Sequence, residues 1–137
     1  GDKEFQQYSS LSNKYIKVVP FINDMASAYS LSDLVICRSG ALTISELTAC
    51  GKPSILIPFA AAAGDHQLKN AKTLSKKGAS IIIEEKDFDS KILLSKINDL
   101  INDDSKLSSM SIASKKLGNK DATKIIVDLI AKGNYIV

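Results

Sequence analysis

The residues best suited to chemistry directly follow an apolar run at 33–37, which is typical of a strand. Ser39, Gly40 and Ala41 then form a turn of small residues that leads into an amphipathic helical pattern. A helix that starts after such a turn leaves its first backbone N–H groups without partners, and these groups attract phosphate or another anion. Glu46, about one turn further on, can accept hydrogen bonds from sugar hydroxyls. The stretch therefore predicts a cradle for a nucleotide sugar.

A purely structural interpretation of the same stretch stays open. Thr43-Ile-Ser-Glu46 fits a capping box, in which Glu46 only reaches back to a backbone N–H at the helix start. Arg38 fits either a structural residue of the turn or a surface cation that pairs with Asp33.

A second group of polar side chains opens the helix that we predict over residues 66–77. Gln67 and Asn70 are three residues apart and share a helical face, and amides that both donate and accept hydrogen bonds suit sugar hydroxyls. In the alternative, Asp65 is only an N-cap, and His66 and Gln67 are solvated residues of the first turn.

The elements that must position these residues alternate along the chain. Strands are predicted over residues 14–19, 33–37, 54–58 and 79–84. Helices are predicted over residues 2–10, 25–29, 42–50, 66–77, 89–102, 105–117 and 122–132. Consecutive apolar positions in strands that helices separate are typical of βαβ units, so we expect an α/β fold with a parallel sheet covered on both faces.

Three loops leave the carboxyl ends of the predicted strands, at residues 20–24, 38–41 and 59–67. Ligands of open parallel sheets bind outside these strand ends, so the loops should converge on one rim. Phe21 and Ile22 lie in the first loop, where they can pack against the core or flank a planar base.

Composition limits the possible partners of the chain. With 137 residues, 45% of them hydrophobic and 24% charged, it is expected to form one globular domain. The net charge of +3 suits a phosphate-bearing ligand or an anionic membrane surface, and the lack of a basic run with interleaved aromatics argues against nucleic acid. Cys37 and Cys50 fit a reducing compartment. No apolar run is long enough to span a bilayer, and no signal peptide opens the chain.

Several kinds of catalytic site are excluded. His66 is the single histidine, no Gly-x-Ser-x-Gly elbow is present, and the adjacent Asp65 is a poor orienting group for His66. The histidine, cysteine and carboxylate residues show no metal-ligand spacing. Gly-x-Gly-x-x-Gly and P-loop motifs are also missing. We therefore predict no catalytic residue, metal or cofactor within this chain.

Taken together, the motifs resemble the C-terminal half of the MurG family, the bacterial peptidoglycan N-acetylglucosaminyltransferases. The resemblance is close over residues 14–84, and the helical tail follows it in pattern only. It rests on the stretches Pro20–Met25, Asp33–Glu46, Gly51–Pro53, Ile57–Phe59 and Asp65–Ala71. Arg-Ser-Gly-Ala-Leu-Thr-x-Ser-Glu combined with Asp-His-Gln-x-x-Asn-Ala is a specific signature.

The resemblance implies a GT-B enzyme, in which two Rossmann-like domains face each other across a cleft without a metal requirement. Ile22 would contact the uracil with Phe21 beside it, Glu46 would hold the ribose, and Gln67 and Asn70 would bind N-acetylglucosamine. Main-chain groups of the turn after Arg38, itself kept as a structural residue, would hold the diphosphate, with the Thr43 hydroxyl as a further candidate. The residues assigned to donor binding are Phe21, Ile22, Ser39, Gly40, Ala41, Leu42, Thr43, Glu46, His66, Gln67 and Asn70, of which His66 has an amide as its equivalent in some relatives.

The function so implied is inverting transfer of N-acetylglucosamine from UDP-N-acetylglucosamine to lipid I (undecaprenyl-diphospho-MurNAc-pentapeptide), which forms lipid II for the cell wall. The chain would be a single partial domain over residues 1–137, the donor half of a Rossmann-like GT-B fold with a helical C-terminal tail. Lipid I would bind the N-terminal domain, and the whole enzyme would contact the cytoplasmic side of the inner membrane peripherally.

The family's glycine-rich loops, its acceptor site and its Gly-Gly-Ser-x-Gly-Ala turn are not found in the sequence. A strand or two is therefore expected upstream of Gly1, and the chain alone is expected to be inactive and to bind its donor weakly. Two alternatives remain: a donor-half subunit of another GT-B transferase, and a non-catalytic nucleotide-sugar binding module whose tail helices form the contact surface.

Overall fold

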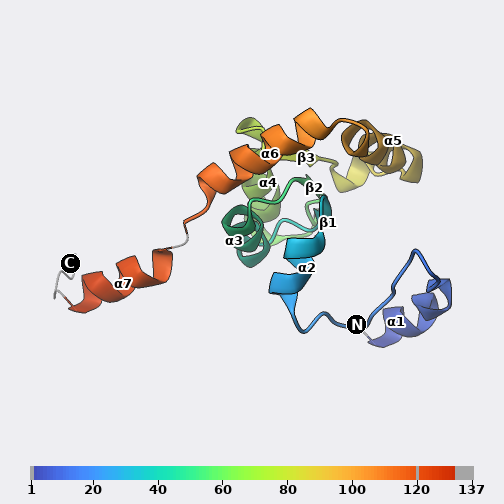
Figure 1. Ribbon diagram of the computed structural model, residues 1–137, viewed down its shortest axis with the longest axis horizontal. Helices are drawn as coiled ribbons and strands as arrows, with labels where there is room; N and C mark the ends of the chain where they lie inside the picture. The colour runs from blue at the N-terminus through green and yellow to red at the C-terminus, as the bar shows by residue number, and fades with distance from the viewer. Residues whose placement is uncertain (1, 120, 132–137) are drawn as a thin grey trace. The chain divides into compact units, whose positions relative to one another are not determined.

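The computed structural model describes residues 2–119 and 121–131, which form an α/β structure (Figure 1). The chain divides into two compact units, residues 1–31 and residues 32–137, and each is described by itself.

The first unit contains α1 (Asp2–Tyr8), a 3-10 turn η1 (Ser9–Leu11) and α2 (Met25–Leu31). Asp24 caps α2, since its carboxylate accepts hydrogen bonds from the Ser27 N–H at 3.0 Å and the Ser27 hydroxyl at 2.6 Å. These bonds lower the pKa of Asp24.

The strand predicted over residues 14–19 is wrong. The Asn13 side-chain oxygen accepts the backbone N–H groups of Tyr15 (2.8 Å) and Ile16 (3.1 Å), and the Ser12 hydroxyl oxygen accepts that of Val18. Short polar side chains that bond to nearby backbone compete in this way with a sheet ladder. Three of the apolar side chains that suggested a strand, Tyr15, Ile16 and Val19, are left exposed, and Tyr15 is 84% exposed.

The second unit holds a three-stranded parallel sheet in the order β1 (Val35–Cys37), β2 (Ser54–Leu56) and β3 (Ser80–Ile82). Its helices and 3-10 turns are α3 (Ala41–Cys50), η2 (Ala63–Asp65), α4 (His66–Lys76), η3 (Glu85–Asp87), α5 (Ser90–Ile101), α6 (Asp104–Leu117) and α7 (Ala122–Ala131) (Figure 1). The predicted fold class, a Rossmann-like parallel sheet with helices on both faces and a helical C-terminal tail, is confirmed. The remaining strands are shorter than the sequence indicated.

The core of this unit lies against one face of the sheet. Ile55 and Ile83 pack with Leu100 of α5 and Met110 of α6. Because side chains alternate along a strand, Leu56, which is fully buried, points to the opposite face from Ile55. The sheet is therefore a rigid base for the loops that leave its strand ends.

Helix α6 also packs against α3, at a close contact that needs glycine. A Cβ atom on Gly118 would lie 2.5 Å from the Thr48 carbonyl oxygen, so the backbones approach too closely for any side chain. The Ser111 and Ser114 hydroxyls donate to the carbonyl oxygens of Gly51 and Leu47. These contacts fix the C-terminal end of α3. Among the described residues, no helix combines the length and the apolar character that crossing a bilayer requires.

Candidate functional site

The first turn of α3 has no capping side chain. Gly40 is the N-cap, with φ −63° and ψ 153°, and Ile44 donates its N–H to the Gly40 carbonyl at 3.0 Å. A capping box would need Thr43 as the N-cap, but Thr43 is the third residue of the helix, so that alternative is wrong. The N–H groups at this helix start are therefore not covered by a side chain of the cap residue.

Ser39 joins this helix start to α4. Its side chain is fully buried, and its hydroxyl donates to the Gln67 carbonyl oxygen at 2.8 Å. Its own carbonyl oxygen accepts a hydrogen bond from the Asn70 side-chain amide at 3.1 Å. Two loops that the sequence predicted to converge, at 38–41 and 59–67, therefore do meet at the carboxyl ends of β1 and β2.

The side-chain amides of Gln67 and Asn70 are half used by these contacts. The Gln67 side-chain oxygen accepts the Phe59 N–H at 3.0 Å, as the Asn70 NH₂ group donates to Ser39. The Gln67 NH₂ group and the Asn70 side-chain oxygen make no hydrogen bond within the described residues. Each amide therefore keeps one polar group for a ligand while the other fixes a loop.

Two left-handed residues shape the start of α4. Gly64 has φ 61° and Asp65 has φ 55°, so the chain turns sharply before His66. Asp65 stands at the N-cap position as predicted, but its side chain makes no cap hydrogen bond. The predicted capping role is wrong because an N-cap side chain reaches its helix from an extended backbone, which Asp65 does not have. His66 is exposed, and its ring lies close to Gly64.

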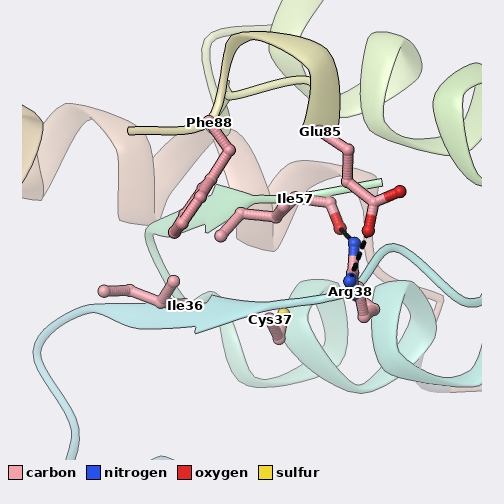
Figure 2. A pocket seen from close by; sticks show the side chains of 6 residues that line it. All are labelled: Ile36, Cys37, Arg38, Ile57, Glu85 and Phe88. Carbon is pink, nitrogen blue, oxygen red and sulfur yellow. Dashed lines mark hydrogen bonds and ion pairs between the residues drawn. The ribbon is translucent and has the colours of Figure 1, made fainter. Parts of the chain in front are cut away.

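Arg38 connects three loops of the rim. Its guanidinium forms an ion pair with Glu85 at 2.6 Å and donates to the Ile57 carbonyl at 3.1 Å (Figure 2). It also lies 5.4 Å from the centroid of the Phe59 ring. The alternative of a pair with Asp33 is wrong, and the structural role is confirmed. Glu85 follows β3, and no local sequence signal links it to Arg38.

The other carboxylate oxygen of Glu85 accepts the Ala60 N–H at 2.7 Å. This backbone hydrogen bond, followed by the hydrogen bond from Arg38, lowers the pKa of Glu85. The carboxylate therefore stays charged at neutral pH and holds both partners.

A pocket of about 480 Å³ lies beside this pair and was not foreseen from the sequence. Figure 2 shows Ile36 and Phe88 on the side of the pocket away from Arg38 and Glu85. The lining residues are Ile36, Cys37, Arg38, Ile57, Glu85 and Phe88. Burial raises the pKa of the Cys37 thiol to about 11, so this thiol is not a ready nucleophile at neutral pH.

Phe21 and Ile22 belong to the first unit, where both side chains are exposed. Their place beside a base stays a prediction, as do the ligand roles of Thr43 and Glu46. Among residues 2–119 and 121–131, no group of histidine, cysteine and carboxylate side chains gathers in a way that could hold a metal ion.

Comparison with known protein families gives a match over most of the chain. The model described as "Glycosyltransferase family 28 C-terminal domain" matches residues 1–126.

Curated relatives are named UDP-N-acetylglucosamine--N-acetylmuramyl-(pentapeptide) pyrophosphoryl-undecaprenol N-acetylglucosamine transferase. The Geobacter metallireducens protein is 48% identical over 111 residues, which are 81% of this chain and 30% of the relative. The Syntrophus aciditrophicus protein is 51% identical over 112 residues, 82% of this chain and 31% of the relative. The chain thus spans about 30% of the length of these relatives.

A solved structure has the same fold. The crystal structure of Acinetobacter baumannii MurG superposes with a TM-score of 0.86 at 36% sequence identity. The match covers 96% of this chain and 41% of that one.

Proposed function

The chain belongs to the family of glycosyltransferase family 28 C-terminal domains, and on this premise we propose that it is the donor-binding part of an N-acetylglucosaminyltransferase. The whole enzyme would move N-acetylglucosamine from UDP-N-acetylglucosamine to lipid I and form lipid II. The printed names of the relatives, which contain both this donor and an undecaprenol-linked N-acetylmuramyl-pentapeptide, support this substrate pair.

The observation that carries the proposal is the junction of α3 and α4 through Ser39, Gln67 and Asn70. It sets an uncapped helix start beside two half-used amides, which suits a ligand that joins a diphosphate to a sugar. In this arrangement the backbone from Ser39 to Thr43 holds the diphosphate, and the free amide groups hold the sugar. Glu46 would hold the ribose. The uracil contacts that the family resemblance implies for Phe21 and Ile22 stay a prediction, because both residues belong to the first unit.

The chemistry we infer is an inverting displacement. The acceptor C4 hydroxyl attacks the anomeric carbon, the new C–O bond forms as the bond to the diphosphate breaks, and the hydroxyl proton passes to a base outside this chain. Negative charge grows on the departing UDP. The N–H groups and the dipole at the start of α3 stabilise that charge, an effect that can be worth a few kcal/mol.

The acceptor also indicates where the whole enzyme would work. Its undecaprenyl chain lies in the membrane, so the enzyme would act as a peripheral protein at the cytoplasmic side of the inner membrane. Its product would enter peptidoglycan synthesis, on which cell shape and cell division depend.

Calorimetric titration of the chain with UDP, UDP-N-acetylglucosamine, UDP-glucose and ADP tests this proposal. We expect the three uridine ligands to bind, UDP-N-acetylglucosamine most tightly, and ADP not to bind. Glu46→Ala should weaken all three by about tenfold, because the ribose loses a charge-assisted hydrogen bond. Glu84→Ala, which changes a half-buried carboxylate paired with Lys86, is the matched control and should leave them unchanged. If ADP bound as well as UDP, a uridine-specific donor site would be contradicted.

A further inference from the structure

Glu85 and Arg38 form a cross-loop clamp, which we define as these two side chains with the backbone of Ile57–Ala60 that they hold. Arg38 binds the Ile57 carbonyl and one Glu85 oxygen (Figure 2). The second Glu85 oxygen accepts the Ala60 N–H. Both oxygens of the carboxylate are therefore engaged. The clamp joins the loop after β1, the loop after β2 and the segment after β3.

The clamp continues into the residues proposed to bind the sugar. Phe59 and Ala60 are consecutive, and their N–H groups are bound by different side chains, Gln67 for the first and Glu85 for the second. A shift of this backbone would therefore move the Gln67 amide. On the other side of the clamp, Arg38 directly precedes Ser39, whose carbonyl oxygen fixes the Asn70 amide.

The clamp's importance lies in geometry and not in Coulomb energy. The side chains of Arg38 and Glu85 are 49% and 30% exposed, and ion pairs this open to water contribute little stability. The neighbouring pair of Glu84 and Lys86, at 3.2 Å, joins residues two apart and fixes no other loop. Glu85 differs because it accepts the backbone N–H of Ala60, which lies 25 residues earlier in the chain, and so fixes the loop after β2.

The start of α3 depends less on this clamp. Its first turn is closed by its own backbone, through the bond from Ile44 to Gly40, and the buried Ser39 hydroxyl anchors it to α4. Loss of the clamp should therefore disturb the amides more than the helix start that would hold a diphosphate.

We propose that Glu85 is a positioning residue that acts through Arg38 and the Phe59–Ala60 backbone to orient the Gln67 and Asn70 amides, and so sets the preference for a sugar nucleotide over the bare nucleoside diphosphate. The inference rests on the proposed function, since it assigns the selectivity of the same site. It concerns a residue outside the motifs that carry the family resemblance.

Titration of wild type, Glu85→Ala, Glu85→Gln and Glu84→Ala with UDP and UDP-N-acetylglucosamine tests the inference. In Glu85→Ala we expect UDP-N-acetylglucosamine to bind about five- to tenfold more weakly and UDP to change less than about twofold, the size expected when hydrogen bonds are misaligned. Glu85→Gln keeps an acceptor for the Ala60 N–H and should restore most of the preference for UDP-N-acetylglucosamine over UDP. Glu84→Ala, one residue away and outside the clamp, should match wild type.

Equal weakening of both ligands in Glu85→Ala would overturn the inference, because a merely structural role lowers both together. If wild type bound neither ligand, the proposed function would fail, and the selectivity role with it. Amide hydrogen exchange tests the clamp independently of the proposed function, because the measurement needs no ligand. Exchange at Phe59 and Ala60 should be faster in Glu85→Ala than in Glu84→Ala, and equal rates would overturn the clamp itself.

Discussion

The starts of helices α3, α4, α5 and α6 fall into two groups. Helices α5 and α6 begin with an aspartate cap: Asp89 accepts the Lys91 N–H at 2.6 Å, and Asp103 accepts the Lys106 N–H at 2.9 Å. Helices α3 and α4 begin at the loops that leave the carboxyl ends of β1 and β2, and neither has a side-chain cap.

The difference separates stability from function. A cap satisfies the orphan N–H groups of a helix start and stabilises the protein, but it also occupies the groups that an anion would bind. In the described part of the second unit, α5 and α6 have the stabilising arrangement, whereas α3 and α4 lack it where a ligand is proposed to sit. The comparison therefore predicts that adding a cap at the start of α3 lowers ligand affinity, whereas removing a cap from α6 lowers stability and leaves ligand affinity unchanged.

Installing a cap at the start of α3 should have the largest effect. Gly40→Asp fits the structure, because a Cβ there meets only the Thr43 hydroxyl oxygen at 3.9 Å and the backbone is extended. We expect UDP affinity to fall by about a hundredfold, since the new carboxylate takes the N–H groups and repels the diphosphate. Stability should rise by a few tenths of a kcal/mol.

Gly40→Ala is the matched control for this change, because it adds the Cβ without an acceptor. It should retain most of the UDP affinity in calorimetry. If Gly40→Asp bound UDP as well as Gly40→Ala does, the diphosphate would not sit at this helix start.

Removing a cap from α6 should lower stability without changing ligand affinity. Asp103→Ala should lower the free energy of unfolding by about 1 kcal/mol in urea titration, because the Lys106 N–H loses its acceptor. UDP affinity should stay unchanged.

The matched variant is Asp65→Gly at the uncapped start of α4. It should change the free energy of unfolding by less than about 0.5 kcal/mol, because Asp65 makes no cap hydrogen bond and glycine readily adopts its φ of 55°. If Asp65→Gly lowered the free energy of unfolding by about 1 kcal/mol, as a lost cap would, the division into capped and uncapped helix starts would be contradicted.

The smallest expected effect is on pH dependence at the clamp. The Ala60 N–H and then Arg38 hold the pKa of Glu85 below its ordinary value of 4.5, so the carboxylate's contribution to stability is complete above that value and is lost as the pH falls through the lowered one. Carboxyl NMR titration should give a midpoint below 4.5 for Glu85. In Arg38→Ala the midpoint should rise only part of the way, since the Ala60 hydrogen bond, the largest single cause, remains. A midpoint that returned fully to the ordinary value would show that the Ala60 N–H does not lower the pKa of Glu85 by itself.

Much of the scaffold could be predicted from the sequence, because helix patterns and caps depend on residues close together. The helix predicted over residues 42–50 closely matches α3, and Gly51 ends it in the left-handed conformation that helix ends commonly adopt. The same local reasoning failed where a second local option competed. The apolar residues 14–19 are not a strand because Ser12 and Asn13 bind their N–H groups.

The candidate site shows the same division. The Ser39–Glu46 stretch and the Gln67/Asn70 pair were found from residue type and spacing. The bonds that join them, from Ser39 to Gln67 and from Asn70 to Ser39, connect residues about thirty positions apart and leave no trace in spacing. The capping box, the Asp65 cap and the Arg38–Asp33 pair were wrong for a related reason, since each paired residues that lie within about five positions of each other in the sequence.

By itself, the sequence determined the order of the βαβ units, the helix starts proposed to bind a ligand and the family to which they point, because short-range hydrogen bonding and hydrophobic periodicity depend on residues close together in the chain. Only the tertiary structure decided that Glu85 is the partner of Arg38 and which half of each amide stays open. Parallel strands bring the loops after β1, β2 and β3 to one edge, and the contacts made there depend on register and packing, which no local pattern records.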